Sequence, residues 1–181
     1  MEAPEVPTEH LHEEMHEHAK RGERWTLGVA LSSAILASLA AMSSLNAGHY
    51  ANEAMIAQIE SANQWSYYQA KSIKEAQLRS KMDILEALGK PAVAADERKF
   101  AQYEDDKEKA QKKAERLERE AKHFLRTHQV LARSVTMFQV AIAVGAISVL
   151  TKRRKFWFVS LCFGGVGVAF ALQSLYTVLH H

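Results

Sequence analysis

The chain has 181 residues, with 23 Lys plus Arg, 21 Asp plus Glu and a formal net charge of +2. This balance gives no support for nucleic-acid binding, and the single cysteine, Cys162, excludes an internal disulfide and a multi-cysteine metal site. Charge is strongly segregated, because residues 25–52, 134–151 and 156–181 carry none while residues 96–122 carry eighteen charged side chains. A chain divided in this way is not an ordinary soluble globular protein.

Residues 1–24 form an acidic, His-rich tail with a basic end. The run from His12 to His16 reads H-E-x-x-H, the pattern of zinc proteases. Four His and four Glu crowd residues 9–18, however, so the match arises easily from composition. The sequence therefore favours a solvated amphipathic tail, with weak binding of a divalent metal by His10, His12, His16 and His18 as the alternative. We predict no catalytic residue and no resident cofactor.

Three apolar segments are predicted to be transmembrane helices: residues 25–46, 132–151 and 156–179. Each approaches or exceeds the roughly 20 apolar residues that cross a bilayer. No acidic or basic residue lies deep inside a span, which argues against an ion-coupled carrier. The second and third spans are joined by the basic turn 152–155.

Basic residues near short loops predict the orientation of the spans. They precede the first span and fill the turn between the second and third: Lys20, Arg21, Arg24, Lys152, Arg153, Arg154 and Lys155. Three spans with a cytoplasmic N-terminus place both clusters in the cytoplasm. Residues 47–131 are then expected outside.

Residues 47–131 are rich in good helix formers and are broken once, at Leu88-Gly89-Lys90-Pro91. We expect a long antiparallel helical hairpin, resembling a coiled coil, with its turn at 88–95. Each arm of about 40 residues is roughly 60 Å long.

Both arms show heptad seams. The second arm and second span place apolar or small residues at most positions of one repeat: 93, 100, 107, 114, 121, 128 and 135, with 96, 103, 110, 117, 124, 131 and 138. The unbroken register predicts that this arm and the second span form one helix. The first arm offers a small, partly polar seam: Ile56, Ile59, Asn63, Ser66, Ala70, Ile73, Gln77, Ser80, Ile84 and Ala87. Such a seam favours close packing and needs more partners than one arm.

Small residues recur in the first and third spans and suit close helix packing. Those singled out are Ser33, Ala37, Ser44, Gly165 and Gly167. Packing is the favoured interpretation, and pore lining by the first span is the alternative. Histidines at positions 49, 123, 128, 180 and 181 would gather at the outer face, where they could respond to metal or pH.

The segment from Glu60 to Lys74 resembles the signature of a bacterial family known as domain of unknown function 4337, and its specific core consists of Asn63, Trp65, Tyr68, Gln69, Ala70 and Lys71. The tail, the first span and the stretch from Ser148 to Arg154 before a Trp-containing last span are similar too. The resemblance covers nearly the whole chain and implies a prokaryotic inner-membrane protein, with a periplasmic hairpin in the orientation above. It implies no activity.

The signature contains residue types that are enriched in protein contacts. We expect a band that holds the hairpin to its partner arm and to neighbouring subunits: Asn63, Trp65, Tyr67, Tyr68, Gln69, Phe100 and Tyr103.

The sequence as a whole predicts an all-α integral membrane protein with three transmembrane helices and the hairpin. We expect a non-enzymatic, homo-oligomeric scaffold or assembly protein whose partners are other copies and the lipid bilayer, with no nucleic acid. The alternative is a ring-shaped pore or channel modulated by metal or pH through the histidines.

Overall fold

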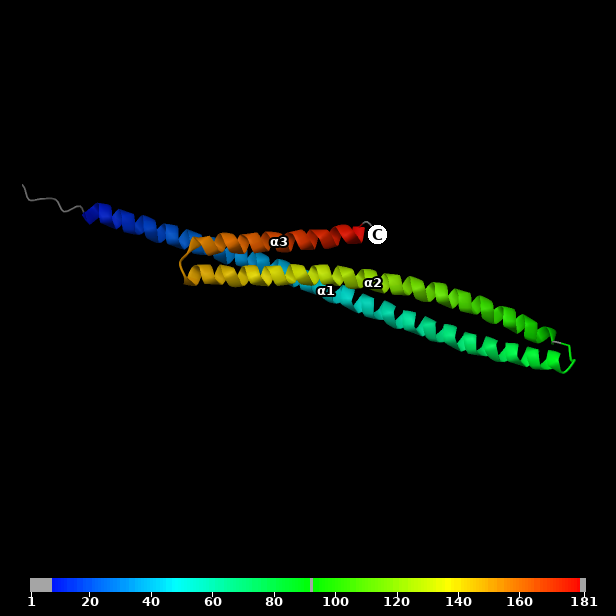
Figure 1. Ribbon diagram of the computed structural model, residues 1–181. Coiled ribbons are helices and arrows are strands. Elements are labelled where there is room, and N and C mark those ends of the chain that lie inside the picture. Colours follow the sequence, from blue (N-terminus) through cyan, green and yellow to red (C-terminus); the bar gives the residue numbers. More distant parts are fainter. Residues whose placement is uncertain (1–7, 92, 180–181) are drawn as a thin grey trace, which may run out of the picture. The chain divides into compact units, whose positions relative to one another are not determined.

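The computed structural model describes residues 8–91 and 93–179, with side chains from residue 24 onward. These residues form three helices and no strand: α1 (Thr8–Ala87), α2 (Ala94–Leu150) and α3 (Arg154–Leu179) (Figure 1). The expected all-helical class is confirmed, and the second arm and second span share the single helix α2. Each of the three helices is long and apolar enough to cross a membrane.

The C-terminal ends of α1 and α2 have the same hydrogen-bond pattern. Gly89 (φ 69°) and Lys152 (φ 53°), each two residues after the end of α1 or α2, adopt the left-handed conformation. The next amide at each turn donates back five residues, from Lys90 to the Leu85 carbonyl at 2.9 Å and from Arg153 to the Ser148 carbonyl at 3.2 Å. This pattern satisfies carbonyls that the helix end would otherwise leave unpaired. It fixes α1 to end at Ala87 and α2 to end at Leu150.

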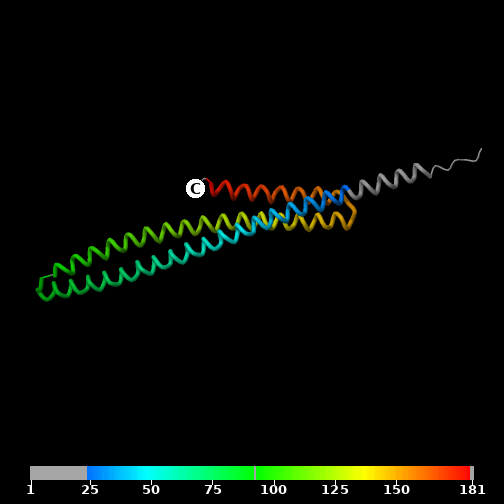
Figure 2. Tube along the Cα trace, turned by 180° about the vertical axis from the view of Figure 1, so that it is seen from behind, coloured from blue at the N-terminus to red at the C-terminus, as the bar shows by residue number. Residues whose placement is uncertain are grey.

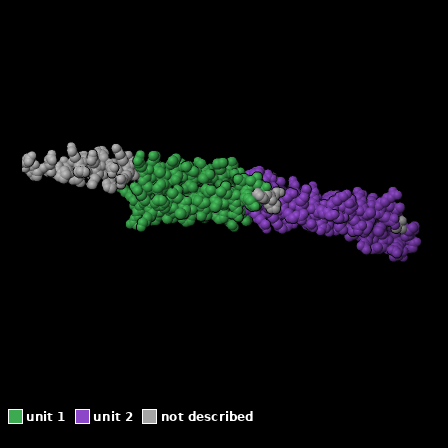
Figure 3. Space-filling view, turned by 90° about the horizontal axis from the view of Figure 1, so that it is seen from above, with its two compact units in different colours: residues 1–47, 129–181 green, residues 48–128 purple. Residues whose placement is uncertain are grey.

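The chain divides into two compact units, coloured separately in Figure 3. We call residues 48–128 the hairpin unit and residues 1–47 with 129–181 the apolar unit. In the hairpin unit, α1 supplies a first arm (48–87) and α2 a second arm (94–128), which run side by side in opposite directions (Figure 2).

The second arm packs through the predicted seam. Ala110, Ala114, Leu117 and Ala121 are buried, at spacings of four and three residues. Small side chains at these positions let the arms approach closely, and the Ser61 hydroxyl donates to the Ala114 carbonyl at 3.0 Å.

The first arm packs through a different seam from the predicted one. Its buried and half-buried positions also repeat every three or four residues: Ala54, Ala57, Ser61, Gln64, Tyr68, Lys71, Glu75, Leu78, Met82 and Leu85. The predicted seam from Ile56 to Ala87 is exposed at every position, so its assignment to the contact between the arms is wrong. We call those ten exposed positions, named in the sequence analysis, the outer stripe. The observed seam also contains Lys71 and Glu75, which have charged partners on the second arm.

The apolar unit packs segments of all three helices. Its core contains Leu36 and Ala40 of α1 with Phe138 and Ala141 of α2, and Phe163 of α3 packs against them. Contacts place α3 antiparallel to α2 and parallel to α1. Phe138 is fully buried.

Candidate interaction site on the helical hairpin

Two ion pairs cross between the arms at the middle of the hairpin. The Lys71 ammonium donates to Asp106 at 2.6 Å, and Lys107 pairs with Glu75 in the opposite sense. The side chains of Lys71 and Asp106 are only 15% and 23% exposed, so solvent screens them less than a surface pair. Each arm thus contributes one cation and one acid. Sliding one arm along the other would separate both pairs, so they favour a single alignment of the arms.

Aromatic rings surround these cations. The Lys71 ammonium lies 5.1 Å from the ring centroids of both Tyr67 and Tyr103, and the Lys107 ammonium lies 5.8 Å from that of Tyr68. Ring faces attract cations at such distances. Trp65 meets Tyr68 edge to face, with ring centroids 5.6 Å apart.

The surroundings stabilise the charged form of both lysines. The hydrogen bond to Asp106, followed by that to Tyr67, raises the pKa of Lys71. The hydrogen bond to Glu75 likewise raises the pKa of Lys107. Both side chains therefore stay cationic at neutral pH.

The residues of the expected aromatic band differ in exposure. Trp65, Tyr68, Phe100 and Tyr103 are half-buried, and Tyr68 and Tyr103 contact lysines as described above. Asn63, Tyr67 and Gln69 are exposed, with Tyr67 45% exposed. Contact of this band with the partner arm is observed, whereas its contact with neighbouring subunits stays a prediction. Sequence reasoning missed Glu75 and Asp106 and did not predict the ion pairs of Lys71 and Lys107, although the opposite charges of Lys71 and Glu75, four residues apart on one arm, were a signal.

A third ion pair lies near the turn, where Lys81 donates to Asp96 at 2.6 Å. Asp96 is buried although it is charged. Because Asp96 lies in the first turn of α2, its carboxylate also favours the start of that helix.

In the apolar unit, hydroxyl groups bridge helices. Ser134 donates to the Gly167 carbonyl at 2.8 Å, and Ser160 donates to the Ala141 carbonyl at 2.6 Å. The Trp157 indole donates to the Ser32 hydroxyl at 3.2 Å. These bonds join α3 to both other helices without any charged group.

Glycines allow α3 to approach its neighbours. A Cβ at Gly167 would lie 2.7 Å from the Phe138 ring, and one at Gly164 would lie 2.8 Å from Leu36. A Cβ at Gly165, in contrast, would meet nothing within 4 Å. Of the two glycines singled out in the sequence, only Gly167 lies in a contact between described helices, and Gly164 was missed.

The residues singled out in the first span lie on different sides of α1. Ser33 is half-buried, and its hydroxyl would be 3.3 Å from a Cβ at Gly145 of α2. Ala37 and Ser44 are exposed.

The basic turn Lys152–Lys155 is exposed. Within the apolar unit, the Arg154 guanidinium lies 5.9 Å from the ring centroid of Trp25. This contact joins the start of α3 to the first apolar segment of α1.

The histidines give no assembled metal site among the described side chains, which contain no group of three or more His, Cys, Asp or Glu arranged to hold an ion. His10, His12, His16 and His18 lie outside the residues whose side chains are described, as do His180 and His181. His49 and His123 lie beside Tyr50 and Phe124, whose rings stack at 6.2 Å.

The family assignment rests on residues 9–177, which match the family described as domain of unknown function (DUF4337). The chain belongs to this family. The matched residues include the whole hairpin, the predicted signature, the first two apolar segments and the third as far as residue 177. No curated protein and no solved structure matches the chain.

Proposed function

We propose that this member of DUF4337 is a multi-pass protein of the bacterial inner membrane, with its N-terminus in the cytoplasm and its hairpin in the periplasm. The proposal rests mainly on the surface of the apolar unit. Large apolar side chains are exposed on all three helices, among them Leu27, Leu31, Leu45, Leu150, Leu172 and Leu179. Water would disfavour such a surface, and lipid would accept it.

The internal chemistry of the apolar unit supports the same proposal. Ser134, Ser148 and Ser160 are buried, and each donates its hydroxyl to a backbone carbonyl. Small residues and hydroxyl hydrogen bonds are the usual means by which helices associate in lipid. The exposed basic turn supports the orientation.

The proposed role is that of a non-enzymatic, homo-oligomeric scaffold. The ion pairs and aromatic contacts of the hairpin provide a stiff element of fixed alignment, which suits a structural role. Its exposed Asn63, Tyr67 and Gln69 remain open for contact with other subunits. In this role the chain needs no cofactor and binds no nucleic acid.

Selective labelling tests the membrane arrangement. In a Cys162→Ser background, Gln111→Cys places a thiol on the exposed side of the second arm, and Thr151→Cys places one beside the basic turn without changing its charge. We expect a membrane-impermeant maleimide to label Gln111→Cys in intact cells and Thr151→Cys only after permeabilisation. The opposite pattern would reverse the orientation. Release of the chain by alkaline carbonate would contradict membrane insertion.

A pore is the second candidate, and one surface of α1 favours it. Ala34, Ala37, Ala41 and Ser44 form an exposed, uncharged strip at helical spacing within the apolar unit. Small and hydroxyl-bearing residues there suit either another helix or a water-filled lumen. Conductance in planar bilayers that is altered by Ser44→Leu would favour the pore, and absence of conductance would favour the scaffold.

A further inference from the structure

The outer stripe of the first arm is an exposed helix face with the spacing of a helix–helix contact. Its ten positions alternate at intervals of three and four residues and include no charged side chain. Ile56, Ile59, Ile73 and Ile84 are between 51 and 60% exposed. Large aliphatic side chains repeated along one solvated face usually mark a binding surface.

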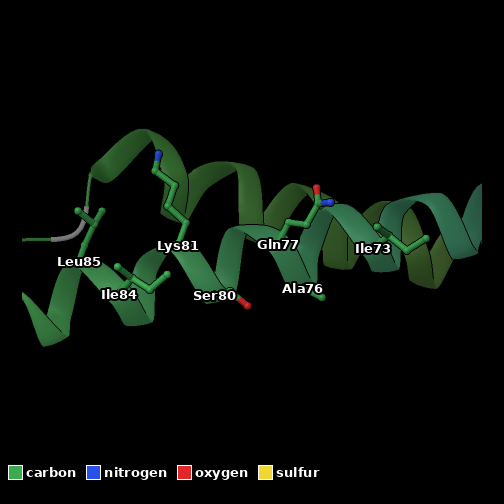
Figure 4. A pocket seen from close by; sticks show the side chains of 7 residues that line it. All are labelled: Ile73, Ala76, Gln77, Ser80, Lys81, Ile84 and Leu85. Atoms are coloured by element: carbon green, nitrogen blue, oxygen red, sulfur yellow. The ribbon is translucent and has the colours of Figure 1, made fainter.

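Part of the outer stripe borders a groove of about 590 Å³ on α1 (Figure 4). Four stripe residues line it: Ile73, Gln77, Ser80 and Ile84. The second arm does not fill this face, because the first arm meets it through the other seam, which contains Lys71 and Glu75. The first arm therefore presents two faces at helical spacing, and among the described residues the second arm contacts one of them.

The chemistry of the outer stripe suits a second copy of itself. Asn63 and Gln77 carry amides that both donate and accept, so each can pair with the same residue of an identical helix. Lipid tails could satisfy neither amide. A polar residue at one core position of a helix pair also specifies its register and partner number.

We propose that the outer stripe is the contact surface between copies of this chain, joining first arms in parallel and in register. Two copies in one membrane extend their hairpins from the same face, which requires parallel arms. This inference rests on the proposed homo-oligomeric scaffold and names the surface by which that scaffold assembles.

The residues flanking the outer stripe permit this arrangement. In a parallel pair, a flanking residue faces a residue five positions away on its partner, further along the chain for one flank and earlier for the other. The charged flanking residues then face uncharged ones: Glu60 faces Met55, Lys74 faces Gln69, Lys81 faces Ala76 and Asp83 faces Leu88. No like charges meet. From Ile56 to Ala87 the contact is about 46 Å long. This is longer than three to four heptads, the length over which a heptad repeat indicates a coiled coil.

Disulfide formation between copies tests the surface directly. In the Cys162→Ser background, Ser66→Cys and Ser80→Cys place thiols on the outer stripe, and Ala101→Cys is a matched exposed control on the second arm. We expect mild oxidation of native membranes to produce covalent dimers of both stripe variants and few of the control. In an antiparallel pair, Ser66 would instead face Gln77, so a lack of dimer from both stripe variants overturns the parallel arrangement.

A charge introduced into the outer stripe provides a second, independent measurement. We expect Ile73→Asp to weaken self-association by about tenfold or more, because the carboxylate meets its own copy across the contact. Arg79→Asp, exposed and off the stripe, is the control. Oligomers that are unchanged by Ile73→Asp would overturn the stripe as the contact while leaving the scaffold proposal intact. A monomeric wild-type chain would overturn both.

Discussion

The hairpin unit and the apolar unit both pack small side chains and both use hydroxyl-to-carbonyl bonds between helices, but the hairpin adds ion pairs. In the hairpin, Lys71 and Lys107 reach acids on the opposite arm. In the apolar unit, Ser134 and Ser160 reach backbone carbonyls. The proposed membrane insertion of the apolar unit predicts this difference, because moving a charge into hydrocarbon costs far more than moving a hydroxyl group that keeps a hydrogen bond.

The largest effect is expected where α3 lies closest to α2. Gly167→Leu should destabilise the apolar unit by about 3 kcal/mol or more, because even a Cβ there would lie 2.7 Å from the Phe138 ring. Gly165→Leu is the matched control, since its site is open and exposed. Thermal unfolding in detergent, followed by Trp157 fluorescence, measures both. Equal stability of the two variants would show that this packing is absent.

A smaller effect is expected from one hydroxyl. Ser160→Ala removes the bond to the Ala141 carbonyl and should cost about 1 kcal/mol, the usual scale for such bonds between helices in membranes. Thr136→Ala, whose hydroxyl binds a carbonyl of its own helix at an exposed position, should cost less. The same unfolding assay compares them, and a larger cost for Thr136→Ala would refute the role of the bridge.

Alkaline pH should lower the stability of the hairpin unit. Because the pKa values of Lys71 and Lys107 are raised above 10.5, the stabilisation they give is complete below pH 10.5 and is lost as the pH rises through the raised values. With Trp65 kept as the only tryptophan, we expect the denaturant midpoint of the hairpin to fall across that range. The Lys71→Met and Lys107→Met double variant should lose this pH dependence, and its persistence there would assign the effect to other groups.

The smallest effect is expected on the solvated side of the second arm. Lys112 pairs with Glu108 one helical turn away, but both side chains are more than half exposed. Such pairs contribute little, so Lys112→Ala should leave the hairpin midpoint unchanged. A loss comparable to that of Lys71→Met would contradict the distinction between crossed and surface pairs.

Sequence reasoning succeeded where burial and hydropathy agree. Ala110, Ala114, Leu117 and Ala121 mark the second-arm seam because they repeat at helical spacing among mostly charged neighbours. The charge-free segments likewise identify all three helices that could cross a membrane.

Sequence reasoning failed where the contact between the arms includes charged residues. The first arm carries two candidate seams. From the sequence alone, the isoleucines make the outer stripe the more apolar of the two. The other seam contains Lys71 and Glu75, whose partners on the second arm only the structure shows. The choice of Gly165 over Gly164 has a similar cause, because only the position of Leu36 reveals which side of α3 is in contact. Local periodicity finds a face of a helix but does not identify its partner.

Native mass spectrometry of the purified chain in mild detergent tests the central claim most directly. The account predicts a defined assembly of two or more copies that dissociates in Ile73→Asp and persists in Arg79→Asp. A wild-type chain that remains monomeric at every concentration would contradict it.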